Sequence, residues 1–213
     1  KTYHIAAPTV FISSLTPHTK RGEIGAQTFD GVVLGQHTGQ VTPEQIKSTG
    51  ATFTIIGHSE VRKRGETQAE RKEKVLAALK NKLTTIVCFG EATRDKEGKY
   101  LGELEGDIKE TLHDVPRELF NNLVIAYEPL WAIGSKEPAT PSECFEVVIA
   151  IRRALASLSG IDYAKKVNIL YGGSVTKESS KAFLEEGGVD GLLIGRASQD
   201  VTSFFEIITS CHN

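Results

Sequence analysis

The sequence predicts an α/β fold built on a parallel sheet, and three observations lead to that prediction. Seven apolar segments alternate strictly with helical segments along the 213 residues, and such alternation is typical of parallel strands joined by right-handed crossovers. The apolar segments are nearly continuous, as strands covered on both faces require. Almost every one ends in polar or glycine-rich residues, which indicates a barrel with its site on one face. A closed barrel of this kind needs eight strands, so the predicted barrel of seven strand-helix units is incomplete.

The first elements follow from local patterns near the N-terminus. Residues 3–7 form an apolar strand that Pro8 ends, and residues 10–15 form a short helix. A second strand covers residues 23–27. The loop from Thr28 to Val41 follows, and loops of that length are usually functional or part of an interface. Thr42-Pro43-Glu44-Gln45 is a capping box that opens a helix ending near Gly50.

The later elements repeat this alternation. Strands are predicted at residues 53–56, 84–89, 123–127, 167–171 and 191–194. Apolar spacings of three and four residues predict helices over 68–81 and 101–115, and further helices include residues 182–184 and 201–208. The capping box Thr140-Pro141-Ser142-Glu143 opens a helix that is expected to bury Phe145, Val148, Ile149 and Leu155. The charged run from Arg71 to Lys74 is interpreted as a solvated helix face.

Composition bounds the class of protein. With 39% hydrophobic and 24% charged residues, residues 1–213 are expected to form one globular domain. The net charge of -2 argues against a nucleic-acid or membrane surface as partner. No bilayer-spanning run or secretory leader is visible. The three cysteines fit neither a disulfide framework nor a zinc site, which suggests the cytoplasm. Because the sequence begins at Lys1 and contains no Met, we expect it to be processed, truncated or incomplete.

A lone carboxylate stands at the end of the fifth predicted strand. Glu128 follows the strand directly, Pro129 prevents further ladder pairing, and a small-residue loop containing Gly134 comes next. The carboxyl ends of parallel strands are where α/β proteins carry out their chemistry. The alternative is a solvated loop charge. The residues alone leave these two interpretations equally weighted.

Four strand ends carry specific motifs. They are Gly57-His58-Ser59-Glu60, the stretch from Ala126 to Gly134, Tyr171-Gly172-Gly173-Ser174-Val175, and the stretch from Asp190 to Gly195. Together they resemble triosephosphate isomerase, in the order and at the spacings of that family. The resemblance runs from Tyr3 to the C-terminus and implies the second to eighth strand-helix units of a TIM barrel. The family's first unit, with the Asn and Lys of its first active-site loop, has no counterpart.

The resemblance implies a reaction and assigns roles by position. The family interconverts dihydroxyacetone phosphate and glyceraldehyde 3-phosphate through an enediolate, without a metal or organic cofactor, and it is a standard example of a Glu base acting beside a neutral His. Those positions are Glu128 and His58, supported by Ser59 and Glu60. The implied phosphate cradle comprises Gly134, Ser135, Gly172, Gly173, Ser174, Gly195 and Arg196.

Departures from the family pattern lead to further expectations. Without the loop Lys, a protein consisting of residues 1–213 alone is expected to turn over at least roughly a thousandfold more slowly, or not at all. The strands at 3–7 and 191–194 would face a gap. Loop 28–41, with Thr38 at its tip, implies a homo-oligomer. However, Gln40 and Val61 replace the family's interface ion pair, so the geometry is expected to be non-standard.

Two further differences lie beside the site. Pro138 would stiffen the hinge of the loop after the fifth strand, since proline fixes φ. Arg196 replaces a glycine of the family. We favour an Arg196 side chain that crowds the anion or points outward over one that compensates for the missing cation.

Two alternatives stay open. One is a catalytically inactive homologue that binds phosphate as a binding or structural protein, and the other is a different phosphate-binding barrel enzyme. Taken singly, His58 is more often structural and Gly172-Gly173 could be a turn.

Overall fold

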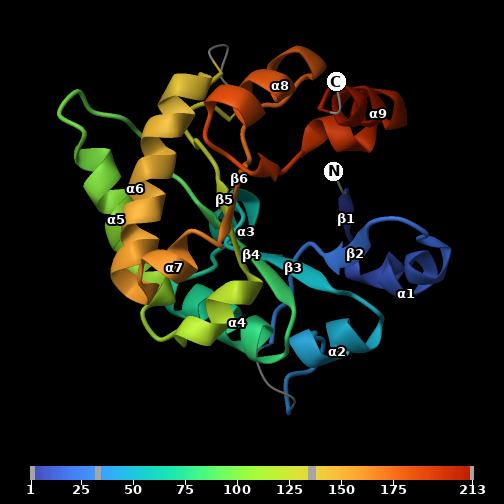
Figure 1. The fold of residues 1–213 in the computed structure, drawn as a ribbon. Coiled ribbons are helices and arrows are strands. Elements are labelled where there is room, and N and C mark those ends of the chain that lie inside the picture. Colours follow the sequence, from blue (N-terminus) through green and yellow to red (C-terminus); the bar gives the residue numbers. More distant parts are fainter. Residues whose placement is uncertain (1–2, 32–34, 134–137, 212–213) are drawn as a thin grey trace. The chain divides into compact units, whose positions relative to one another are not determined.

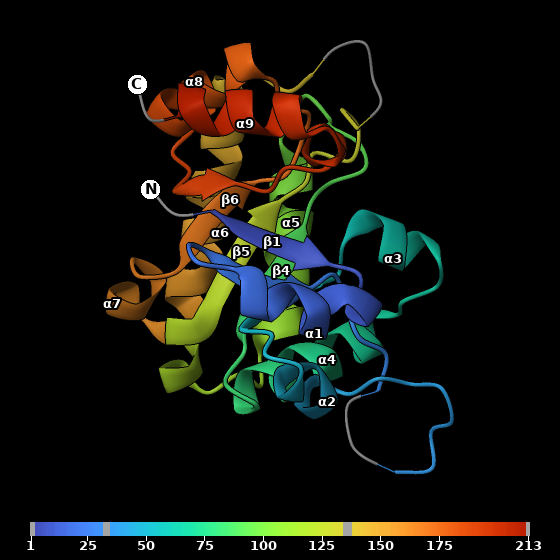
Figure 2. The same ribbon diagram turned by 90° about the vertical axis from the view of Figure 1, so that its right-hand side faces the viewer.

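The computed structural model describes residues 3–31, 35–133 and 138–211, in which every strand pair with an assigned register is parallel. The chain divides into two compact units (Figures 1 and 2). The first unit comprises Lys1–Cys88 and Thr111–Val124, and the second comprises Phe89–Glu110 and Ile125–Asn213. The strands are ordered as the chain forms them, β1 to β4 in the first unit and β5 to β7 in the second.

The first unit is a parallel sheet with short helices between its strands. Its strands are β1 (His4–Ala7), β2 (Glu23–Ala26), β3 (Phe53–Ile56) and β4 (Thr84–Phe89), whose last residue lies in the second unit. Its helices are η1 (Thr9–Phe11), α1 (Ile12–Leu15), η2 (Thr16–His18), α2 (Pro43–Ser48), α3 (Ser59–Lys63), α4 (Gln68–Lys80) and η3 (Arg117–Asn122). Helix α1 packs against β2 (Figure 2). The unit's core includes the fully buried Ile12, Ile46, Ile56 and Leu79.

The second unit places longer helices around three strands. The strands are β5 (Leu123–Tyr127), whose first two residues belong to the first unit, β6 (Asn168–Tyr171) and β7 (Gly191–Leu192). The helices are α5 (Lys99–Leu112), α6 (Pro141–Ser159), α7 (Ile161–Ala164), α8 (Lys177–Glu186), η4 (Arg196–Gln199) and α9 (Val201–Ser210). Helix α6 lies beside α5 in Figure 1, and Tyr100 of α5 donates to Glu146 of α6 at 2.7 Å. No helix in the described part of the chain is long and apolar enough to cross a bilayer.

The predicted strands are confirmed, and their ends shift by at most one residue except in β7. That strand covers only Gly191–Leu192, although the sequence predicts residues 191–194. The capping boxes at Thr42 and Thr140 are confirmed. Thr67 with Glu70 and Thr176 with Ser179 form two more, which the sequence analysis did not identify.

Two predictions of side-chain burial are wrong. Phe145 and Ile149 are 48% and 52% exposed, because the buried stripe of α6 runs through Cys144, Val147, Val148, Ile151 and Leu155. Phe145 follows the buried Cys144 by one position, and Ile149 follows the buried Val148 by one position. One position turns the side chain by about 100° around the helix axis, away from the core.

The charged run on α4 is not a solvated face throughout. Arg71 and Lys74 are both buried. Lys74 pairs with Glu66 at 2.9 Å, and Arg71 donates to Gln68. Their aliphatic stems pack inward while their charged ends find partners, which is how long basic side chains become buried.

Candidate active site

Glu128 lies at the carboxyl end of β5 and is almost completely buried. Only 1% of its surface is exposed. Its amide donates to the Phe89 carbonyl at 2.8 Å, which continues the pairing between the ends of β4 and β5. Pro129, which has no amide proton, follows at once and is also buried. The alternative of a solvated loop charge is therefore excluded for Glu128.

Two glycines allow the chain to approach Glu128 closely. A Cβ atom at Gly90 would lie 1.6 Å from the Glu128 carbonyl oxygen, so only glycine fits there. A Cβ atom at Gly172 would lie 3.3 Å from Glu128 Cγ, which is tight but not a collision. Glu128 is thus held between the loops that follow β4 and β6.

The loops after β6 and β7 begin at neighbouring strand ends in the second unit, which also contains Glu128. Tyr171 of β6 is in register with Leu192 of β7, and the Leu193 amide donates to the Tyr171 carbonyl at 2.8 Å. The Gly172 amide donates to the Tyr127 carbonyl at 2.8 Å. The Gly172 amide is therefore already hydrogen-bonded within the sheet. A phosphate bound here would need donors from the residues that follow Gly172.

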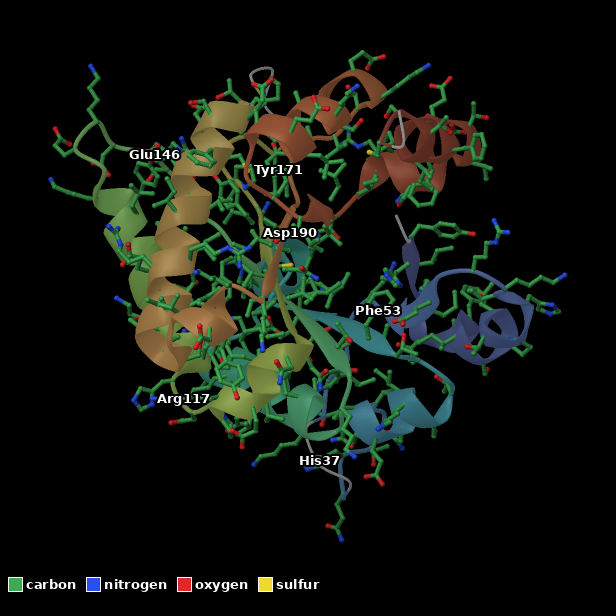
Figure 3. All side chains as sticks on the ribbon, in the orientation of Figure 1. His37, Phe53, Arg117, Glu146, Tyr171 and Asp190 are labelled. Carbon is green, nitrogen blue, oxygen red and sulfur yellow. The ribbon has the colours of Figure 1, made fainter. Side chains whose placement is uncertain are left out.

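The side chains around these two loops differ in exposure. Ser174, Gly195 and Arg196 are exposed, and Arg196 opens the helix η4. Tyr171, labelled in Figure 3, is fully buried and stacks on Phe183 with ring centroids 3.8 Å apart. The loop after β6 therefore begins at a tyrosine whose ring is held by stacking on Phe183.

His58 caps a helix in the first unit. It follows β3 and is the N-cap of α3, where its Nδ1 accepts a hydrogen bond from the Glu60 amide at 3.3 Å. Because Nδ1 is the acceptor, the ring proton is assigned to Nε2, which is then a hydrogen-bond donor. Ser59 is buried and Glu60 is exposed. Gly57 precedes them with a φ of 75°, a conformation that favours glycine.

Other sequence-predicted positions lie in two loops. Gly134 and Ser135 fall outside the described residues, whereas Pro138 is exposed and Ala139 is buried. In the loop after β2, Gly35 to Gln40 are all exposed, Thr38 among them. The described residues include no cluster of three His, Cys, Asp or Glu side chains arranged to hold a metal ion.

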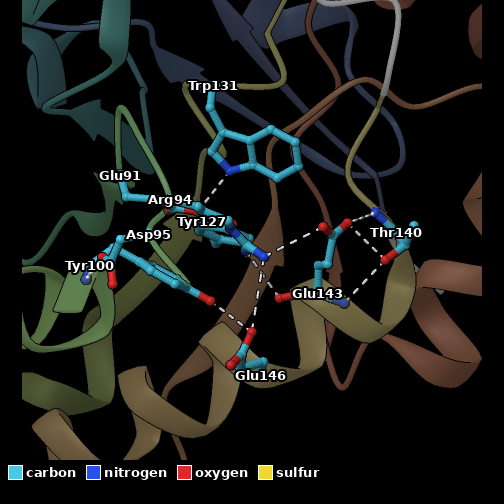
Figure 4. A network of polar contacts seen from close by, with 9 residues as sticks. All are labelled: Glu91, Arg94, Asp95, Tyr100, Tyr127, Trp131, Thr140, Glu143 and Glu146. Carbon is cyan, nitrogen blue, oxygen red and sulfur yellow. Dashed lines mark hydrogen bonds and ion pairs between the residues drawn. The ribbon is translucent and has the colours of Figure 1, made fainter. Parts of the chain in front are cut away.

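A polar network in the second unit was not predicted from the sequence (Figure 4). It centres on Arg94, whose Nε donates to Glu91 Oε1 at 2.9 Å. The Tyr127 hydroxyl and the Trp131 indole donate to the same Glu91 oxygen, at 2.9 and 2.8 Å. Apart from the Thr140–Glu143 capping box, its contacts join the loop after β4 to α5, β5, the loop after β5 and α6, so no local motif reveals them.

The network shifts the pKa values of Tyr127 and Arg94. Burial, together with the neighbouring Glu91 carboxylate, raises the pKa of the Tyr127 hydroxyl, so the phenol stays neutral. Burial works against the charge of Arg94, but its hydrogen bonds to Glu91 and Tyr127 outweigh that effect and raise its pKa. Arg94 is therefore a cation at every working pH.

Comparison with known proteins gives consistent matches. The family model described as "Triosephosphate isomerase" matches residues 1–211. The triosephosphate isomerase of Caldanaerobacter subterraneus subsp. tengcongensis is 41% identical over 187 residues, which are 87% of this chain and 75% of the relative. That of Fusobacterium nucleatum is 41% identical over 188 residues, with the same two coverages. That of Bacteroides fragilis is 38% identical over 207 residues, which are 96% of this chain and 82% of the relative.

Proposed function

The chain belongs to the triosephosphate isomerase family, and from this premise we propose that Glu128 is its catalytic base and His58 its electrophile. The protein is an isomerase that interconverts dihydroxyacetone phosphate and glyceraldehyde 3-phosphate, a step of glycolysis, and its fold class is the parallel TIM barrel. The proposal therefore concerns which residues perform the reaction and how they do so.

Glu128 moves the proton between the two carbons of the triose. The observation that carries this assignment is a carboxylate only 1% exposed at a strand end, flanked by two glycine loops. A base shielded from bulk water returns its proton to the neighbouring carbon before exchange with solvent is complete. Pro129 and the Phe89 carbonyl hold the main chain at Glu128, so the carboxylate pivots on a fixed backbone.

His58 donates from Nε2 to the oxygen that becomes negative in the enediolate. Support comes from its Nδ1, which is engaged by the Glu60 amide and leaves the donor proton on the other nitrogen. Ser59 and Glu60 support the turn that orients the ring. The enediolate forms when the C–H electron pair moves into a carbon–carbon double bond and the carbonyl oxygen takes the charge.

The phosphate cradle consists of main-chain amides at the ends of β6 and β7. We assign it to Gly173 and Ser174 together with Gly195 and Arg196, and Gly134 and Ser135 complete it from the preceding loop. Gly172 contributes by its lack of a side chain rather than by its amide, which the Tyr127 carbonyl occupies. Amides with small side chains let an anion approach the backbone closely.

Steady-state turnover of glyceraldehyde 3-phosphate tests the assignment. Glu128→Gln is expected to lower kcat by about 10²- to 10⁴-fold, the range of general-base contributions, and His58→Gln by about 10²- to 10³-fold. Glu185→Gln, an exposed carboxylate on α8, is the matched control and should leave kcat unchanged. Turnover of Glu128→Gln within threefold of the unaltered protein would overturn the proposal.

The assembly and location of the protein belong to the same proposal. Residues 1–213 form one domain that associates with itself through loop 28–41, whose described residues from Gly35 to Gln40 are exposed. The reaction takes place in the cytoplasm, where cell fractionation should find it. Recovery of the protein in a secreted or membrane fraction would contradict that location.

A further inference from the structure

One guanidinium contacts the chain on both sides of Glu128. Arg94 Nε donates to Glu91 Oε1 at 2.9 Å, and Nη2 donates to the Tyr127 hydroxyl at 3.0 Å. Tyr127 immediately precedes Glu128 and is fully buried. The Arg94 side chain is itself only 17% exposed. These contacts hold the side chain of Tyr127, the residue before Glu128, in one position.

The same guanidinium covers the chain after Glu128. Its central carbon lies 4.9 Å from the ring centroid of Trp131 and 4.9 Å from that of Tyr100, so the cation lies over two aromatic rings. The Trp131 indole also donates to Glu91 Oε1 at 2.8 Å, and the Leu130 amide donates to the Glu91 carbonyl at 3.1 Å. Residues 130 and 131 are therefore tied to the same pair, Glu91 and Arg94.

A third set of contacts reaches the first turn of α6 (Figure 4). Arg94 Nη2 donates to the Glu143 carbonyl at 3.3 Å, and Nη1 lies 3.7 Å from the Glu143 carboxylate. That carboxylate in turn accepts from the amide and hydroxyl of Thr140, at 2.7 and 2.8 Å. Arg94 thus links the N-terminus of α6 to Tyr127 and Trp131, the residues on either side of Glu128.

We propose that Arg94 is a positioning residue that holds Tyr127, Trp131 and the first turn of α6 in one arrangement and thereby sets the orientation of Glu128. This inference rests on the proposed function. A planar group with five donors makes these contacts together, whereas a lysine ammonium lacks both the stacking surface and the fork of donors. Small displacements of a base are costly, since a misplacement of about 1 Å lowers turnover by about 10²-fold.

The test compares three variants of the full chain. Arg94→Lys keeps the charge and removes the planar fork. Glu143→Gln keeps a residue suited to the capping box but removes the charge that faces Arg94. Arg152→Lys is the matched control, because Arg152 also binds main-chain carbonyls and a carboxylate, those of Ala164, Val167 and Asp190, and lies outside the network.

Each variant is measured for kcat and KM with glyceraldehyde 3-phosphate and for its melting temperature. The environment of Trp131, the one tryptophan of the sequence, is followed by fluorescence with glycerol 3-phosphate, an unreactive phosphate of similar size. Arg94→Lys is expected to lower kcat by about 10- to 100-fold with KM changed less than about threefold, and to shift the Trp131 emission. Glu143→Gln should lower kcat by about threefold, and Arg152→Lys should change melting temperature alone.

Two results would overturn the inference. One is a kcat for Arg94→Lys within twofold of the unaltered protein, and the other is an equal fall in Arg152→Lys. If Arg94→Lys does not fold, Glu143→Gln decides, because an unchanged kcat and unchanged Trp131 emission in that variant reject the coupling. If Glu128→Gln retains turnover, the proposed function fails. If Glu128→Gln loses turnover and Arg94→Lys does not, the inference alone fails.

Discussion

At Glu128, a buried carboxylate depends on two neighbours that have no side chain. Gly90 faces its carbonyl oxygen and Gly172 faces its Cγ. A methyl group at Gly90 would collide with the backbone, so that position governs folding. A methyl group at Gly172 would press only on the Glu128 side chain and the Tyr127 carbonyl, each 3.3 Å away. A substitution at Gly172 is therefore expected to displace the Glu128 side chain with little effect on the stability of the fold.

We therefore predict that Gly172→Ala lowers kcat by about tenfold, because the carboxylate must shift by a few tenths of an ångström. Its melting temperature should fall by less than about 2 °C, the shift that a loss of about 0.5 kcal/mol produces in a protein of this size. Steady-state kinetics and thermal melting measure the two effects. The control is Gly106→Ala on the exposed face of α5, where nothing lies within 4 Å of an added Cβ atom. An unchanged kcat in Gly172→Ala would contradict the expected pressure on Glu128.

The sequence predicts residues of this kind only when they stand at the end of a strand. Glu128 and His58 follow apolar runs, and their motifs are short and local. Arg94 has no such signal, because its partners lie at positions 91, 100, 127, 131, 143 and 146. Only the fold brings those positions together. A network of this kind is invisible to any argument from periodicity or spacing.

At the scale of the element, the first turns of α6 carry two carboxylates that lie near Arg94. Glu143 accepts hydrogen bonds from Thr140 and lies near Arg94, while Glu146 lies one turn further along. Burial alone would raise the pKa of Glu143, but the bonds from Thr140 and the Arg94 charge outweigh burial and lower that pKa below its ordinary value. The ionised carboxylate therefore stabilises the folded state.

The sign of the pH effect follows from that lowered pKa. A depressed carboxyl pKa adds stability above the unfolded-state value, and this stability is lost as the pH falls through the folded-state value. Glu143→Gln is thus expected to be less stable by about 0.5 to 1 kcal/mol at pH 7. The difference should disappear as the pH falls below 4.5, the ordinary value for this carboxyl.

Denaturant unfolding across this pH range measures the difference in the free energy of unfolding. Glu185→Gln serves as a reference, because that carboxylate is 62% exposed and pairs with Lys181 within α8. A difference between Glu143→Gln and the unaltered protein that stays constant from pH 7 to pH 3 would show that the charge of Glu143 contributes nothing.

Elements were predicted more accurately than the faces they bury. Strands appeared as apolar runs and helices began at capping boxes, both of which are local signals. Burial on α6 was predicted incorrectly for Phe145 and Ile149, since counting apolar residues does not say which stripe faces the core. Arg71 and Lys74 were misjudged for the opposite reason, because a run of charged residues does not show that two of its side chains pack inward beside Gln68 and Glu66.

At the scale of the molecule, the alternation of strand and helix predicts the fold class, and the family match agrees with it. Self-association is the proposal that belongs to this scale. The described tip of loop 28–41 is exposed from Gly35 to Gln40. A charge buried in a contact between subunits costs several kcal/mol unless it is paired, so one substitution at the tip is enough to test association.

We predict that the unaltered protein sediments with the mass of at least two chains and that Thr38→Glu sediments as one. If Thr38 contacts the partner subunit as proposed, an added carboxylate at that position would be desolvated on association. Thr202→Glu, the same change at an exposed position of α9, should keep the assembly. Analytical ultracentrifugation measures all three proteins. Equal masses for Thr38→Glu and the unaltered protein would place the contact elsewhere.

The central claim is that Glu128 removes a proton from carbon in an isomerase of the triose phosphates. The most direct measurement is deuterium incorporation at C1 of dihydroxyacetone phosphate, followed by NMR in D₂O. The unaltered protein is expected to incorporate deuterium faster than buffer alone, and Glu128→Gln about 10²- to 10⁴-fold more slowly than the unaltered protein. Incorporation by Glu128→Gln at the rate of the unaltered protein would contradict the account.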